Sequence, residues 1–144
     1  MIGEWYNNEI GKCLYEKYPH DFSICDIDGV CRCFYKLNGS WLIRLVIYES
    51  KHNDESISNT QLDTLYFLDD AVDWTKFDKY SGTFLIQHDE NLDELRVHKI
   101  INNSKTVRPN LELKYIKTIT MDALYKWISA KDIQKEVQRP SDNG

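Results

Sequence analysis

The sequence predicts an α/β fold in which a mixed central β-sheet is flanked by helices. Three observations lead to this prediction. Stretches with apolar residues at helical spacing alternate with short runs rich in β-branched and aromatic residues. One of these runs, residues 41–51, is apolar on both faces, which is typical of a strand in the middle of a covered sheet. With 144 residues, the chain can also bury one core without disulfides or structural metal.

The first part of the chain is predicted to form a helix followed by three strands. Residues 3–18 have apolar side chains at helical spacing, and Pro19 then stops the helix. The strands are expected over residues 22–30, 31–36 and 41–51. The Asn38-Gly39 pair between the last two strands is a strong signal for a hairpin turn.

The rest of the chain is predicted to form a second helix, three further strands and a closing helix. Ser58 or Asn59 is expected to cap the second helix, over residues 61–74. The further strands are expected over residues 82–89, 94–101 and 111–119. Thr120 begins the closing helix. No linker divides the chain, so residues 1–133 are expected to form a single domain and residues 134–144 a disordered polar tail.

Composition and the absence of targeting signals narrow the class of protein. No apolar run is long enough for a membrane span, and the first residues lack the pattern of a signal peptide, so we expect a cytoplasmic protein without a membrane partner. Disulfides are not expected in that compartment. A zinc site formed by Cys25, Cys31, Cys33 and His20 is an alternative. Because no two cysteines have the usual two-residue spacing, buried thiols are favoured.

Charge is distributed unevenly along the chain, whose net charge is −5. Residues 1–95 carry 8 Lys/Arg against 18 Asp/Glu, whereas residues 96–135 carry 9 against 3. An acidic part that holds cations beside a basic part that holds phosphates suits an enzyme that acts on a polyanion. The basic residues expected to contact phosphates are Lys99, Lys105, Arg108, Lys114 and Lys117.

Acidic residues and a lysine stand at the ends of two predicted neighbouring strands. Glu49 and Lys51 share a face at the end of the central strand, and Asp26 and Asp28 share a face near the preceding strand. Two convergent carboxylates with a lysine can form a Mg²⁺ site with a group that clamps phosphate. A salt bridge at a strand end is the alternative interpretation of Glu49 and Lys51.

A wider pattern resembles the core of the PD-(D/E)XK nuclease superfamily. Its parts are Asp28-Gly29-Val30, the hairpin, the apolar strand Leu45-Val46-Ile47, then Glu49-Ser50-Lys51 and a helix that carries Gln61. The resemblance implies a restriction-endonuclease-like fold, Mg²⁺ or Mn²⁺ as cofactor, Asp28 and Glu49 as metal ligands, and Lys51 as the residue that orients or activates water. The RecB-like branch of the superfamily also has a helix glutamine, which matches Gln61.

The chain departs from the pattern of this superfamily at two positions. Ile27 stands where the motif has proline, and Tyr66 follows Gln61 by one position more than usual, which turns Tyr66 to another side of the helix. Asp26 remains an alternative to Asp28, although Gly29 leaves room for a phosphate backbone beside Asp28. Glu9 falls within the apolar stripe of the first helix, so it is expected to pair with a lysine or a backbone amide, or to join the metal ligands.

The sequence therefore predicts a metal-dependent nuclease, with DNA favoured because the resembling superfamily mostly cuts DNA. Pairing into a homodimer would suit a small protein that cuts a duplex. One alternative is a non-catalytic, nuclease-like module that binds nucleic acid or protein. Another is a haloacid-dehalogenase-like phosphatase, because Asp26-Ile27-Asp28-Gly29 resembles the opening motif of that family, with Asp26 as nucleophile and Asp28 as acid or base.

Overall fold

The computed structural model describes residues 9–17, 27–104, 106 and 110–133. Over these residues the chain forms a helix, two strands, a helix, three strands and a helix, together with one short 3-10 turn. The elements are α1 (Glu9–Lys17), β1 (Gly29–Leu37), β2 (Ser40–His52), α2 (Asn59–Ala71), η2 (Trp74–Lys76), β3 (Gly82–His88), β4 (Leu95–Asn102), β5 (Leu111–Ile119) and α3 (Met121–Ile128). The predicted strand over residues 22–30 falls partly, and the predicted tail entirely, outside the described residues.

The five described strands form one mixed sheet in the order β1-β2-β3-β4-β5. Strands β2 and β3 are parallel, whereas the other neighbouring pairs are antiparallel. A parallel pair needs a crossover connection, and the segment that contains α2 provides it. The predicted mixed α/β fold is therefore confirmed at the level of its class.

The β1–β2 hairpin is the longest paired segment of the sheet. Its turn is closed by Asn38 and Gly39, which have φ angles of 52° and 83°. These left-handed conformations suit asparagine and glycine, so the predicted hairpin turn is confirmed. The sequence indicated a strand break near residue 31, but β1 runs without interruption from Gly29 to Leu37 because each of its residues pairs with β2.

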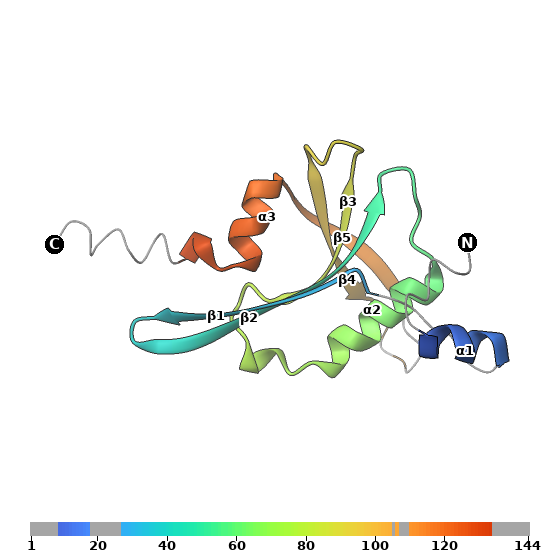
Figure 1. Cartoon of the computed structure of the whole chain (residues 1–144), viewed down its shortest axis with the longest axis horizontal. Coiled ribbons are helices and arrows are strands. Elements are labelled where there is room, and N and C mark those ends of the chain that lie inside the picture. The colour runs from blue at the N-terminus through green and yellow to red at the C-terminus, as the bar shows by residue number, and fades with distance from the viewer. Residues whose placement is uncertain (1–8, 18–26, 105, 107–109, 134–144) are drawn as a thin grey trace.

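Helices α2 and α3 cover opposite faces of the sheet, as Figure 1 shows. On the face that we call the α3 face, Val46, Phe84 and Val97 pack with Trp127 of α3 into the main core cluster. On the other face, called the α2 face, α2 crosses β3, β4 and β5 and buries Leu65. Because side chains alternate along a strand, Ile47 and Glu49 of β2 belong to the α2 face.

The caps of α2 and α3 agree with those predicted from the sequence. Ser58 accepts a hydrogen bond from the Gln61 backbone N–H, and the Gln61 side chain accepts one from the Ser58 N–H, which completes a capping box at α2. Thr120 caps α3 through the Ala123 N–H. Both caps satisfy backbone donors that would otherwise lack partners.

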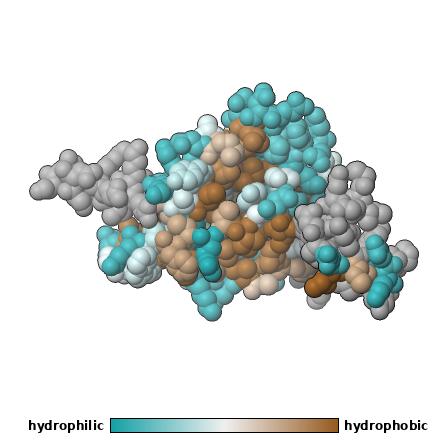
Figure 2. Space-filling view, in the orientation of Figure 1, coloured by the Kyte–Doolittle hydropathy of each residue, from teal (hydrophilic) through white to brown (hydrophobic). Residues whose placement is uncertain are grey.

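The surface in the same orientation has hydrophobic side chains toward its middle, while hydrophilic ones cover the loop regions at its upper end (Figure 2). None of the helices in the described part of the chain is both long and apolar enough to cross a bilayer.

Candidate functional site

Asp28 and Glu49 lie next to each other on the α2 face. The antiparallel register pairs Gly29 with Tyr48, so the residue before Gly29 stands beside the residue after Tyr48. The Glu49 carboxyl group interacts with both the backbone N–H and the carboxyl group of Asp28. Glu49 is only 6% exposed, whereas Asp28 is exposed. We call these two residues the carboxylate pair.

The Asp28 side chain is fixed by β2. Its Oδ2 accepts hydrogen bonds from the Ser50 backbone N–H at 2.7 Å and from the Ser50 hydroxyl at 2.8 Å. These bonds hold Asp28, which precedes β1, against the end of the central strand. The orientation of Asp28 toward Glu49 therefore results from local hydrogen bonding rather than from packing.

Burial and charge repulsion perturb Glu49. Desolvation and, next, the negative charge of Asp28 raise the pKa of Glu49 to about 7, although Lys51 opposes the shift. A carboxyl group with this pKa is close to half-charged at neutral pH. A cation bound beside the pair would favour the charged form of Glu49 and so oppose the effects of burial and of the Asp28 charge.

Lys51 lies one step further along the same face of β2. It is half-buried, and its positive charge lowers the pKa of Glu49, so the two charges interact. Across the sheet, Lys51 stands beside Gln87 of β3, which in turn stands beside Arg96 of β4. Glu49 has a corresponding line of neighbours, Leu85 and then His98. The α2 face thus presents polar side chains from three adjacent strands.

Gln87, Arg96 and His98 belong to this face but were not predicted from the sequence. Gln87 Oε1 lies 2.9 Å from His98 Nε2 and accepts a longer bond of 3.4 Å from Arg96 Nη2. Burial lowers the pKa of His98, and the nearby Arg96 charge lowers it further. The polar end of an otherwise apolar β3 was the available signal for Gln87, but only the strand order brings these three residues beside Lys51.

Gln61 is engaged at the start of α2. Its Oε1 accepts the Ser58 N–H at 3.2 Å as part of the capping box. A contact of Gln61 with water or phosphate would therefore use its Nε2 group, because Oε1 is engaged in the cap. Tyr66, which the sequence places on another side of the helix from the expected site position, is half-buried, and its hydroxyl accepts a hydrogen bond from Asn102 Nδ2 at 3.0 Å.

Glu9 does not face inward as its position in the helical stripe predicted. It is exposed on α1, and within the described ranges no group of three or more acidic, histidine or cysteine side chains is placed to hold a metal. Asp26, the alternative to Asp28, lies outside the described residues.

Three of the predicted phosphate-contacting residues, Lys99, Lys114 and Lys117, are described, and they lie on the face opposite the carboxylate pair. Lys99 and Lys114 pair with each other across β4 and β5, on the α3 face by register with Phe84. The Lys117 ammonium lies 5.0 Å from the centre of the Trp127 ring, also on the α3 face. Lys105 and Arg108 lie outside the described residues.

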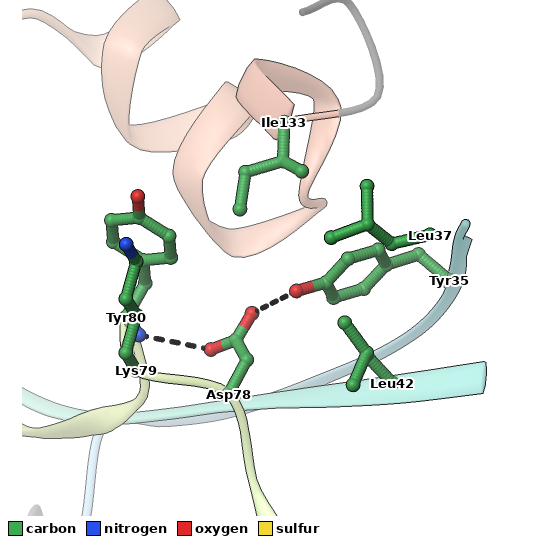
Figure 3. A pocket seen from close by; sticks show the side chains of 7 residues that line it. All are labelled: Tyr35, Leu37, Leu42, Asp78, Lys79, Tyr80 and Ile133. Atoms are coloured by element: carbon green, nitrogen blue, oxygen red, sulfur yellow. Dashed lines mark hydrogen bonds between the residues drawn. The ribbon is translucent and has the colours of Figure 1, made fainter. Parts of the chain in front are cut away.

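A separate hollow of about 500 Å³ lies between the hairpin and the end of α3 (Figure 3). Its lining consists of Tyr35, Leu37, Leu42, Asp78, Lys79, Tyr80 and Ile133. The Asp78 carboxylate in its wall accepts bonds from the Tyr35 hydroxyl and the Arg44 guanidinium. The Tyr80 N–H and Ser81 hydroxyl also bond to Asp78. Because this carboxylate is engaged by four donors, we assign it a structural role.

The carboxylate pair fits a Mg²⁺ or Mn²⁺ site with few protein ligands. Mg²⁺ is commonly held by one or two carboxylates, with waters and substrate phosphates as its other ligands. A buried, partly charged Glu49 beside Asp28 supplies two such groups. Comparisons of the chain with protein-family models, curated proteins and solved structures found no match.

Proposed function

We propose that this protein is a metal-dependent nuclease that hydrolyses phosphodiester bonds at the carboxylate pair. The observation that carries the proposal is the buried Glu49 carboxyl against the Asp28 carboxyl, with Lys51 on the same face. A buried carboxylate next to a second carboxylate is unfavourable unless a cation or a proton relieves the repulsion. A strand-end salt bridge alone would not account for the second carboxylate.

Each residue of the site has a distinct role in this proposal. Asp28 and Glu49 would hold Mg²⁺ or Mn²⁺, which would supply Lewis-acid polarisation of the phosphate and a lower pKa for bound water. Lys51 stabilises the negative charge that develops on the phosphate oxygens and positions the attacking water. Gln87 is held by His98 and lies beside Lys51. Its proposed role is to orient the Lys51 ammonium group toward the substrate.

The order of elements around the pair supports a restriction-endonuclease-like fold. An aspartate precedes a hairpin, a Glu-x-Lys sequence ends the central strand, and a helix then leads to a parallel strand, β3. This arrangement agrees with the PD-(D/E)XK pattern that the sequence resembles.

The phosphatase alternative is less well supported. A Rossmann-like phosphatase is built on a parallel sheet, whereas only β2 and β3 are parallel among the described strands. Asp28 precedes an antiparallel hairpin strand, and the later acidic pair, Asp69-Asp70, lies within α2. A non-catalytic binding module is the second candidate. Two residues predicted to belong to the catalytic site have other surroundings, because Gln61 Oε1 bonds within the helix cap and Glu9 is exposed.

The experiment is a cleavage assay with single- and double-stranded DNA and RNA in Mg²⁺, Mn²⁺ or EDTA. The proposal expects hydrolysis of at least one nucleic acid only with divalent metal, and its loss in Asp28→Asn. The matched control is Asp63→Asn, an exposed aspartate on α2. Intact nucleic acids under all conditions would favour the binding module. Hydrolysis of a phosphomonoester alone would favour the phosphatase.

A further inference from the structure

The β1–β2 hairpin extends as an arm beyond the other three strands (Figure 1). One side of this arm belongs to the α2 face, because alternate residues of β1 share the side of Asp28. Five exposed residues lie on this side. Four of them follow one another along β1, and the fifth lies on β2 opposite the last of these. They are Val30, Arg32, Phe34, Lys36 and Trp41, which we call the hairpin strip.

The hairpin strip exposes aromatic rings to an unusual extent. Phe34 is 55% exposed and Trp41 is 68% exposed. Large rings are normally buried, and their exposure together on one surface is typical of a binding site. These rings also lie on the side of the arm away from α3, so they add nothing to the core that α3 covers.

Each ring has a cation beside it. The Arg32 guanidinium lies 5.1 Å from the centre of the Phe34 ring, and the Lys36 ammonium lies 5.7 Å from the centre of the Trp41 ring. By register, Lys36 and Trp41 are directly opposite each other. Aromatic rings that can stack on flat groups thus alternate with positively charged side chains along the strip.

The charge of the arm contrasts with that of the whole chain. Residues 29–48 contain Arg32, Lys36 and Arg44 and no aspartate or glutamate, although the chain has 23 acidic residues and a net charge of −5. Arg44 is buried on the other face, so Arg32 and Lys36 supply the surface charge. The strip is therefore complementary to an anion that also has flat, apolar surfaces.

The strip leads directly to the carboxylate pair. Asp28, Val30, Arg32, Phe34 and Lys36 alternate along one side, so Asp28 is about 20 Å from Phe34 at the usual rise of an extended strand. A ligand that lay along the strip would have its end at Asp28 and Glu49. The continuity joins a binding surface to the proposed site of chemistry.

We infer that the hairpin strip binds single-stranded nucleic acid and directs it to the carboxylate pair. Phe34 and Trp41 stack on bases, while Arg32 and Lys36 contact phosphates, a combination suited to single strands because unpaired bases expose their faces. A duplex hides those faces, so it is a poorer ligand. This inference rests on the proposed nuclease function only for the direction of the strand, since binding itself requires no catalysis.

The test measures binding without chemistry, by fluorescence anisotropy in EDTA. The probes are labelled oligo(dT) and oligo(rU) of about 20 nucleotides, a few times the site size of a small single-strand-binding domain, and a DNA duplex of the same length. Phe34→Ala should weaken binding of the single strands by about tenfold or more, the scale of one lost stack, and Trp41→Ala should do the same. The control is Tyr125→Ala on α3, because Tyr125 is 54% exposed and has no part in the strip.

The charge of the strip is tested separately. Arg32→Gln with Lys36→Gln should reduce the log–log salt slope for single strands by about 1.4, from two lost phosphate contacts. Lys76→Gln with Lys131→Gln, two exposed lysines elsewhere, is the control.

Wild-type affinity in both the aromatic and the charge variants would overturn the inference, as would equal or tighter binding of the duplex. If strip variants lose binding while no nucleic acid is cleaved in Mg²⁺, the strip stands and the nuclease proposal fails. If nucleic acid is cleaved but the strip variants bind normally, the nuclease proposal stands and the inference about the hairpin strip fails.

Discussion

The Glu49 carboxyl group interacts with Asp28 in two ways. It accepts a hydrogen bond from the Asp28 backbone N–H, and it also contacts the Asp28 carboxyl group. The backbone bond favours a charged Glu49, but burial and the Asp28 charge outweigh it and raise the Glu49 pKa to about 7. The pair therefore combines a buried carboxyl group, Glu49, with an exposed one, Asp28, which the backbone N–H and hydroxyl of Ser50 hold in place. Such a pair favours binding of a cation, and it lowers the free energy of unfolding of the metal-free protein.

The metal-free protein should lose stability as pH rises from about 4.5 to about 7. In this window the folded state binds more protons than the unfolded state, because the Glu49 pKa is about 7 in the folded protein, whereas an unperturbed glutamate has a pKa of 4.5. The free energy of unfolding should fall by up to roughly 3 kcal/mol from this group. Glu49→Gln should remove this component and be more stable than wild type at a pH above the folded pKa.

Urea denaturation in EDTA at several pH values measures this difference, with Glu90→Gln, an exposed glutamate, as the control. Identical pH dependence in wild type and Glu49→Gln would show that Glu49 is not perturbed in the way the contacts indicate.

Lys51→Ala should separate binding of metal from chemistry. Removal of the ammonium leaves Asp28 and Glu49 in place and takes away a competing positive charge, so Mn²⁺ affinity should hold or rise. Turnover should fall by about 10²-fold or more, the usual scale for a lost electrostatic stabiliser. Single-turnover cleavage at saturating Mn²⁺ measures the effect. Undiminished cleavage would reduce Lys51 to a strand-end salt bridge.

Asp78→Asn should be strongly destabilising, whereas Asp132→Asn should not. Arg44 is fully buried and donates to Asp78, whose side chain is 6% exposed, and to Asp132, whose side chain is 40% exposed. Loss of the buried partner leaves the buried guanidinium with Asp132, which is partly exposed, as its acidic partner and should cost about 3 kcal/mol or more. Loss of the exposed partner should cost at most about 1 kcal/mol. Equal shifts in the urea midpoint would refute this assignment.

The basic residues of the α3 face should matter only for long substrates. Lys114 and Lys117 lie on the face opposite the carboxylate pair, so a strand must pass around the β5 edge to reach them. Lys114→Gln with Lys117→Gln should lower the salt slope for a strand of about 40 nucleotides by about 1.4 and leave a strand of about 12 nucleotides unchanged. An equal loss for both lengths would indicate that these lysines are part of the primary binding surface.

The pairing of Asp28 with Glu49 was predictable because a two-residue turn fixes hairpin register. Once Asn38 and Gly39 form the turn, Leu37 pairs with Ser40, and the same register carries back to Asp28 and Glu49. Local signals of this kind also identified the Ser58 and Thr120 caps.

Other parts of the site depend on non-local arrangement. No local pattern indicates that Gln87 and His98 stand beside the Glu49–Lys51 face, because their position follows from strand order. Gln61 was assigned to the site, yet it also satisfies a helix cap, a local bond available without any tertiary structure. The face of Lys117 depends on a register shift between β4 and β5 near Val97, which periodicity alone does not reveal.

Calorimetric titration of Mn²⁺ into wild-type protein, Asp28→Asn and Glu49→Gln tests most directly whether the carboxylate pair is a metal site. Asp63→Asn serves as the matched control for a lost surface charge. We expect saturable binding to wild type and the control, and at least about tenfold weaker binding to each of the two pair variants. Wild-type binding should be tighter at about pH 8 than at about pH 6, since metal ligands must be deprotonated. Unchanged Mn²⁺ affinity in both pair variants would contradict a metal site at Asp28 and Glu49, and with it the nuclease proposal.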